Sequence, residues 1–216
     1  MTALVRYITV DSWRSFRWFA PVLVFFAAQA IFDAEPGSVL PTYAGSVALL
    51  FFIAIWLTVV VSNSEDPVQV DVTTSAAGGH MRVRLAKLAA AYLYCTVLIV
   101  IALTVPPLVS SAHTTPYQVA SGAASQAISV LAGVAVGSVC SRPIINQTAF
   151  SVLLGVMVGL GELIVPNAPP VYQLVKLLNE VKPHHLGFLI GAIAAETVVL
   201  STIFVGTSIR VARLKN

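Results

Sequence analysis

Glu196 is the residue whose position in this sequence most directly suggests chemistry. It is the only ionisable side chain deep inside one of the long apolar segments. A charge at the centre of a bilayer costs roughly 2.5–3.5 kcal/mol on insertion scales, so such a residue normally faces protein, water or a partner group. Glu196 is therefore a candidate for contact with a substrate or ion, or for a proton relay. The alternative is a protonated acid that is hydrogen-bonded to a neighbouring helix.

The other reactive side chains do not form a recognisable catalytic or metal-binding pattern. The four histidines are scattered and have no H-E-x-x-H spacing: His80, His113, His184 and His185. Cys95 and Cys140 lie in or beside apolar segments, as buried small hydrophobic residues do. The sequence contains no G-x-S-x-G elbow and no G-x-x-x-x-G-K-[ST] phosphate loop. We therefore expect no catalytic residue, metal or cofactor here, and any ATP hydrolysis that powers the protein must occur on another polypeptide.

The composition predicts an all-α, polytopic membrane protein made of one domain. Of the 216 residues, 57% are hydrophobic and 10% are charged, and the mean hydropathy is +0.88. The apolar runs are continuous, whereas the strands of a membrane barrel would alternate. The net charge of +3 is not gathered into a long basic run, which argues against nucleic-acid binding.

Six segments are long and apolar enough to be predicted membrane spans: 18–32, 42–61, 88–109, 117–139, 148–165 and 187–205. Before them, residues 1–17 predict an interfacial helix, because Arg6, Arg14 and Arg17 fall within about a quarter of a helical wheel. This basic start and apolar core also resemble a signal peptide, with Ala28-Gln29-Ala30 like a cleavage site. We expect the segment to be retained as an anchor.

Residues 62–87 form the longest polar interruption between spans. Acids come first, then the Gly78-Gly79 break, and bases follow: Glu65, Asp66 and Asp71, then Arg82, Arg84 and Lys87. Ser64 or Asp66 can cap a helix whose first turn contains Pro67. The glycines should end that helix, and the three bases are expected at the lipid headgroups.

A second informative loop, 166–186, contains a short amphipathic pattern. Val171, Leu174, Val175 and Leu178 share one helical face, while Lys176 and Glu180 lie on the other side. The pattern predicts a helix that rests on the outer leaflet or caps the bundle.

Orientation follows from the basic residues, which gather in cytoplasmic segments. With both termini inside, including the tail 206–216, ten bases lie in inner segments and two, Lys176 and Lys182, in outer ones. The sequence therefore predicts that 62–87 is cytoplasmic and that 166–186 is external.

This arrangement resembles the permease subunits of type-2 ATP-binding-cassette exporters in a compact bacterial form. The residue-level likeness lies in Glu65-Asp66-Pro67 through Ala76-Ala77-Gly78-Gly79 and the bases that follow. The resemblance implies a coupling helix that docks on a separate nucleotide-binding ATPase, which carries ATP and Mg. The implied contact residues are Glu65, Asp66, Pro67, Val68, Gln69, Asp71, Val72 and Thr73. It also implies a bacterial cytoplasmic membrane and a second permease subunit, identical or homologous, with Gly155 and Gly159 at the interface between the two. Packing within one subunit is the commoner use of such a glycine pair and is the alternative.

The spans contain almost no charge suited to a soluble ionic cargo. A hydrophobic or amphipathic cargo, such as a drug, lipid, peptide or metabolite, fits them better. Two alternatives remain open at this point: a six-span substrate-capture subunit of a vitamin importer, and an intramembrane enzyme or assembly factor that uses Glu196. The long segment 62–87 disfavours the first, and an enzyme would need a second polar partner at the depth of Glu196.

Overall fold

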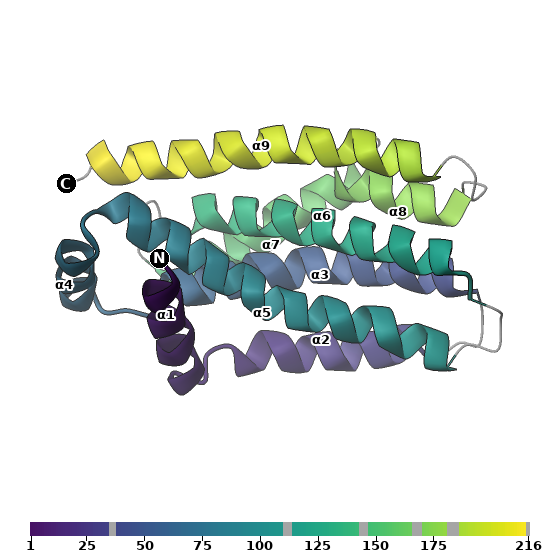
Figure 1. The fold of residues 1–216 in the computed structure, drawn as a ribbon, viewed down its shortest axis with the longest axis horizontal. Helices are drawn as coiled ribbons and strands as arrows, with labels where there is room; N and C mark the ends of the chain where they lie inside the picture. The colour runs from purple at the N-terminus through teal and green to yellow at the C-terminus, as the bar shows by residue number, and fades with distance from the viewer. Residues whose placement is uncertain (35–37, 110–113, 143–146, 166–169, 181–185, 215–216) are drawn as a thin grey trace.

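The computed structural model describes residues 1–34, 38–109, 114–142, 147–165, 170–180 and 186–214, and in these residues all regular structure is helical. The helices form an elongated bundle, with α4 at one end (Figure 1). We call this the α4 end and the opposite one the far end. The helices are α1 (Thr2–Arg14), α2 (Phe19–Phe32), α3 (Val39–Ser62), α4 (Pro67–Ala77), α5 (His80–Val109), α6 (Pro116–Cys140), α7 (Thr148–Ile164), α8 (Val171–Glu180) and α9 (Leu186–Leu214).

Four of the described helices, α3, α5, α6 and α9, are long and apolar enough to cross a membrane. Helices α1 and α2 pass the same test only together, and they are bent by 78° where they join. Helix α7 is apolar but shorter, with 17 residues. The predicted all-helical fold is confirmed for the described residues, and the four long apolar helices are consistent with a multi-pass membrane protein. The six spans stay a prediction.

Helix α5 begins eight residues before the predicted span 88–109 and ends with it at Val109. It begins at His80, so it contains all three bases of the polar segment, and it continues through Pro106 and Pro107 to Val109. Pro107 has no N–H, which leaves the carbonyl of Leu103 without its helical partner. The hydroxyl of the buried Tyr43 on α3 donates to that carbonyl at 3.1 Å. This bond satisfies the freed carbonyl acceptor, so the helix continues through both prolines.

Helix α3 is the centre of the bundle, because α2, α5, α6, α7 and α8 all pack against it. Helix α6 packs against it most extensively and comes close to its backbone at Gly133 and Gly137. A Cβ atom on Gly133 would lie 2.6 Å from the carbonyl oxygen of Phe51 on α3. The hydroxyl of Ser129 adds a buried hydrogen bond of 2.7 Å to the carbonyl of Val47. Small side chains thus allow the two backbones to touch.

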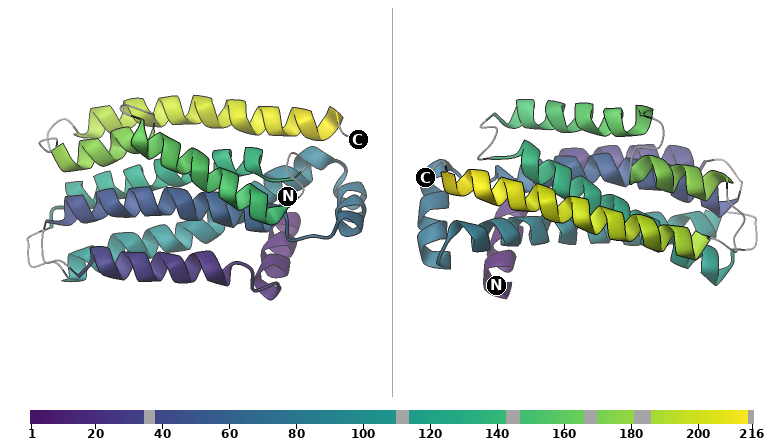
Figure 2. Two further views of the ribbon diagram at one scale, coloured as in Figure 1. Left: turned by 180° about the vertical axis from the view of Figure 1, so that it is seen from behind. Right: turned by 90° about the horizontal axis from the view of Figure 1, so that it is seen from above.

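Helix α8 lies alongside the bundle at the far end rather than across it (Figures 1 and 2). Its apolar residues Val171, Leu174, Leu177 and Leu178 are buried in the core that includes α3. The predicted apolar face is therefore real, but it packs on the neighbouring helices instead of resting on the outer leaflet or capping the end.

The close contact of α6 with α3 predicts that Gly133→Ala destabilises the protein by about 1–3 kcal/mol, because the added methyl group meets backbone that cannot move aside. Thermal unfolding in detergent measures this loss. Gly191→Ala is the matched control, since a Cβ atom there meets nothing within 4 Å. Equal stability of the two variants would contradict the close packing.

Candidate functional site

Helix α4 starts and stops where the sequence predicts. Asp66 is its N-cap in an extended conformation, with φ −65° and ψ 148°, and Pro67 is the first helical residue. Helix α4 ends at Ala77 because Gly78 has φ +75° and Gly79 has φ +135°, conformations that side-chain-bearing residues rarely adopt. The chain then turns directly into α5, so α4 projects from the end of the bundle (Figure 2).

One face of α4 is apolar and open. Val68 is 75% exposed and Val72, one turn later, is 64% exposed. Asp66, Gln69 and Asp71 are also exposed, whereas Thr73 is half-buried. Val68 and Val72 therefore form a small uncovered apolar surface that polar and acidic side chains flank.

Glu65 does not belong to this exposed face. Its side chain is buried, and its Oε2 lies 2.7 Å from Nζ of Lys87 on α5. Its Oε1 accepts a hydrogen bond of 3.1 Å from the hydroxyl of Thr73 on α4. The same Lys87 donates at 3.3 Å to the carbonyl of Ser62 at the end of α3. Glu65 therefore anchors α4 to α3 and α5, and it is not placed to contact a partner.

Arg84 also points into the bundle. Its Nε donates to the hydroxyl of Ser208 on α9 at 3.0 Å, and its two terminal nitrogens donate to the carbonyls of Arg142 and Ser138 at the end of α6. Our expectation that Arg84 and Lys87 lie at the headgroups is wrong, because both form internal polar contacts. A helix that begins at His80 puts the two residues, three apart, on the same face.

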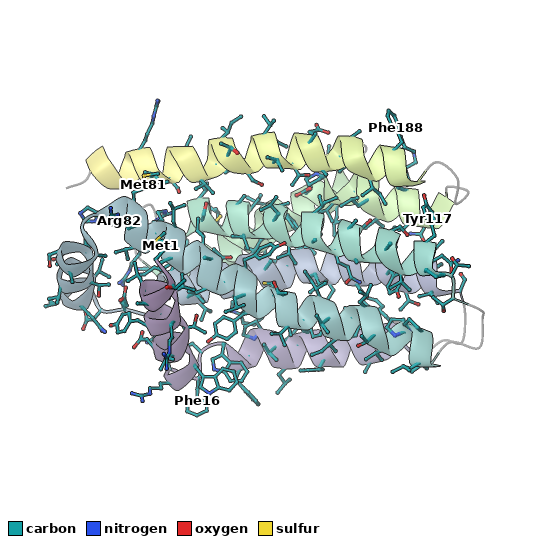
Figure 3. The ribbon with its side chains drawn as sticks, viewed as in Figure 1. Met1, Phe16, Met81, Arg82, Tyr117 and Phe188 are labelled. Carbon is teal, nitrogen blue, oxygen red and sulfur yellow. The ribbon has the colours of Figure 1, made fainter. Side chains whose placement is uncertain are left out.

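Beside α4, a groove of about 810 Å³ separates it from α1. Its α1 wall includes Leu4 and Tyr7, and its α4 wall includes Val72 and Ala76. Nε2 of Gln69 donates to the hydroxyl of Tyr7 at 2.7 Å and bridges the two helices. Met1 and Arg82, which also line the groove, are both at the α4 end (Figure 3).

Gly155 and Gly159 on α7 face α3 of the same chain. A Cβ atom on Gly155 would lie 2.5 Å from Ile55, and one on Gly159 would lie 2.6 Å from Phe52. These glycines serve packing within the subunit, so the predicted dimer contact through them is not available. Side chains elsewhere on α7 are exposed: Phe150, Leu153, Leu154, Met157 and Val158.

Glu196 on α9 is exposed and lines a pocket of about 310 Å³ between α8 and α9. Lys176 on α8 lines the same pocket. Among the described residues no group of His, Cys, Asp and Glu side chains is placed to hold a metal ion. Cys95 and Cys140 are free and buried, as the sequence indicates.

Gln126 is a buried polar residue that sequence reasoning missed. It lies in the interior of α6 with no exposed surface, and neither atom of its amide has a hydrogen-bond partner among the described residues. An unpaired buried amide costs about 1–3 kcal/mol. The surrounding residues, SGAASQ, are small and polar, so the sequence pattern does not reveal that the amide of Gln126 is buried.

Comparisons with known proteins give no family: no family model, no curated protein and no solved structure matches this chain.

The Glu65–Lys87 pair predicts that Glu65→Gln lowers the free energy of unfolding by about 3–5 kcal/mol, because it leaves a buried lysine without its counter-ion. Thermal unfolding in detergent measures the change. Adding Lys87→Met should recover most of the loss. The exposed Asp71→Asn is the control and should change stability by no more than about 0.5 kcal/mol. A Glu65→Gln protein as stable as the control would rule out the buried pair.

A substitution of Gln126 should change stability in the opposite direction. Gln126→Met removes the unpaired amide at similar volume and should raise stability by about 1 kcal/mol. Ser129→Ala, on the same helix, removes the existing hydrogen bond to the carbonyl of Val47 and should lower stability by about the same amount. Loss of stability in both variants would mean that the amide of Gln126 is paired.

Proposed function

We propose that this chain is the transmembrane subunit of an ATP-driven exporter whose ATPase is a separate polypeptide. The observation that carries the proposal is the exposed pair of valines, Val68 and Val72, on a helix that is anchored internally by Glu65. A loop that only joined two spans would need neither the uncovered apolar face nor the buried anchor.

The polar contacts at the α4 end supply a route from α4 to the long helices. Movement of α4 reaches α3 and α5 through Glu65 and Lys87. From α5, Arg84 connects to the end of α6 and to α9. A partner that pulls or tilts α4 therefore acts on several membrane helices at once, as an ATPase that drives transport must.

In this proposal the protein lies in the bacterial cytoplasmic membrane with the α4 end in the cytoplasm. The basic residues of α1 and of the start of α5 lie at the α4 end, as the rule for cytoplasmic loops requires. Six spans result if α2 and α7 cross the bilayer beside the four long helices. The α1–α2 bend lets the arginine-bearing α1 lie along the inner surface.

The active unit is proposed to contain two permease subunits, identical or homologous, and two ATPase subunits. ATP and Mg are bound by the ATPase. A hydrophobic or amphipathic cargo then leaves through the membrane by alternating access, and this chain itself catalyses no reaction.

The test is the effect of α4 on a complex with an ATPase. The tagged full-length chain is purified from its native membranes, and co-purifying proteins with a P-loop are identified by mass spectrometry. We expect Val72→Asp to reduce retention of the ATPase by about 10-fold or more, because a buried interface anchor costs about 2 kcal/mol or more when it is lost. Val72→Leu, which keeps the apolar surface, should retain it.

Thr115→Asp is the matched charge control. It adds the same charge at the N-cap of α6, at the far end, where aspartate is well tolerated. The proposal fails if an ATPase stays bound after Val72→Asp and after deletion of residues 68–77, or if Thr115→Asp releases it equally.

A further inference from the structure

A small pocket lies between α8 and α9. It has a volume of about 310 Å³ and is lined by Gln173, Lys176, Leu177, Leu189, Ala192, Ile193 and Glu196. This volume is at the lower limit of about 300–1,000 Å³ that drug-sized ligand sites occupy. Leu177 and Ile193 are buried and form an apolar floor, whereas Lys176 and Glu196 are exposed.

The register of α6 and α9 sets the depth of Glu196. At the far end, the backbone N–H of Gly187 on α9 donates to the hydroxyl of Tyr117 on α6 at 2.9 Å, across a separation of 70 residues. Figure 3 shows Tyr117 and Phe188 at that end. At the α4 end, Arg84 contacts Ser138 and Ser208, which have the same separation. The two helices therefore run parallel and in register.

Glu196 lies ten residues into α9, which is about 15 Å from the far end of the helix. In a hydrocarbon layer of about 30 Å this position is near the middle. By the register, Gln126 on α6 lies at the same depth. Glu196 thus lies where a charge is most costly, and it faces a pocket rather than the packed interior.

Lys176 faces the same pocket from α8. Among the described residues, the two side chains do not form an ion pair with each other. Charged residues at membrane depth normally line substrate pathways or pair with one another. Two opposite charges that line one pocket without pairing with each other are complementary to a ligand that carries both charges.

We propose that this pocket binds the zwitterionic head of an amphipathic molecule and, if the exporter function holds, is its cargo site. The ammonium group of the ligand contacts the carboxylate of Glu196, and its anionic group contacts the ammonium of Lys176. Its apolar chain remains in the bilayer, which the exposed apolar side chains of α9 face. The cargo class is then a single-chain or diacyl amphipath with one ammonium and one acidic group.

Binding is tested on the full-length chain in phosphatidylglycerol nanodiscs, without any ATPase. The probes are lyso-phosphatidylethanolamine and its N-acetyl derivative, which keeps the phosphate and loses the ammonium. Native mass spectrometry counts the probe that each variant retains. We expect the wild-type chain to prefer the zwitterionic probe by about tenfold or more, the size of one charge-assisted contact. Diacyl phosphatidylethanolamine, added as a competitor, distinguishes a bilayer lipid from a single-chain cargo.

Glu196→Gln should abolish the preference, whereas Lys176→Gln should weaken both probes equally. The control is Asp71→Asn, which makes the same change of charge on α4 and should leave the preference intact. Unchanged preference in Glu196→Gln overturns the proposal. A simple ion pair between Lys176 and Glu196 would also overturn it. In that case Glu196→Gln lowers stability, the double exchange of Lys176→Glu with Glu196→Lys restores it, and no variant discriminates between the two probes. Because no ATPase is present in the binding test, its failure would not affect the proposed role of α4. Failure of the ATPase co-purification test would likewise not affect the binding result.

Discussion

The buried ion pair between Glu65 and Lys87 is the interaction on which the α4 end of the molecule depends. It lies between the end of α3 and the start of α5, with Thr73 of α4 on the other carboxylate oxygen. A buried charge without a partner is strongly unfavourable, so each side chain holds the other in place. The glycine turn at Gly78 and Gly79 then leaves α4 one direction in which to project. The exposed face of α4 is a consequence of that anchor.

Behind the anchor, the bundle is unevenly packed. Around α3 the contacts are close: Gly133 and Gly137 of α6 and Gly155 and Gly159 of α7 all meet it at distances that exclude a methyl group. The contact between α8 and α9 leaves a pocket that both charges face. In the proposed transporter, the closely packed block around α3 is the part that holds its shape, and the contact between α8 and α9 is the part that opens to the membrane.

Local conformational preferences predicted the helix boundaries that a residue sets through its own backbone. The start of α4 at Pro67 and its stop at Gly78 follow from φ preferences alone, and the long apolar runs did predict helices. Contacts between distant segments were not predictable. The positive-inside rule counts Arg84 and Lys87 in the same way whether they face lipid or protein, so the sequence does not reveal their buried partners. The continuation of α5 past Pro107 depends on Tyr43, which is 60 residues from the carbonyl that it satisfies. The glycines of α7 could serve a neighbouring subunit or their own, and only the fold places them against α3.

We propose that α4 is the surface through which a separate ATPase acts on this protein. Site-specific photo-crosslinking in intact native cells tests it most directly, with a photoreactive residue at position 68 or 72 and, as reference, at the exposed position 188 of the far end. We expect a crosslink from α4 to a P-loop ATPase and none to that protein from position 188. A crosslink from α4 to lipid alone, or reaction of α4 with a membrane-impermeant reagent added outside the cell, would contradict it.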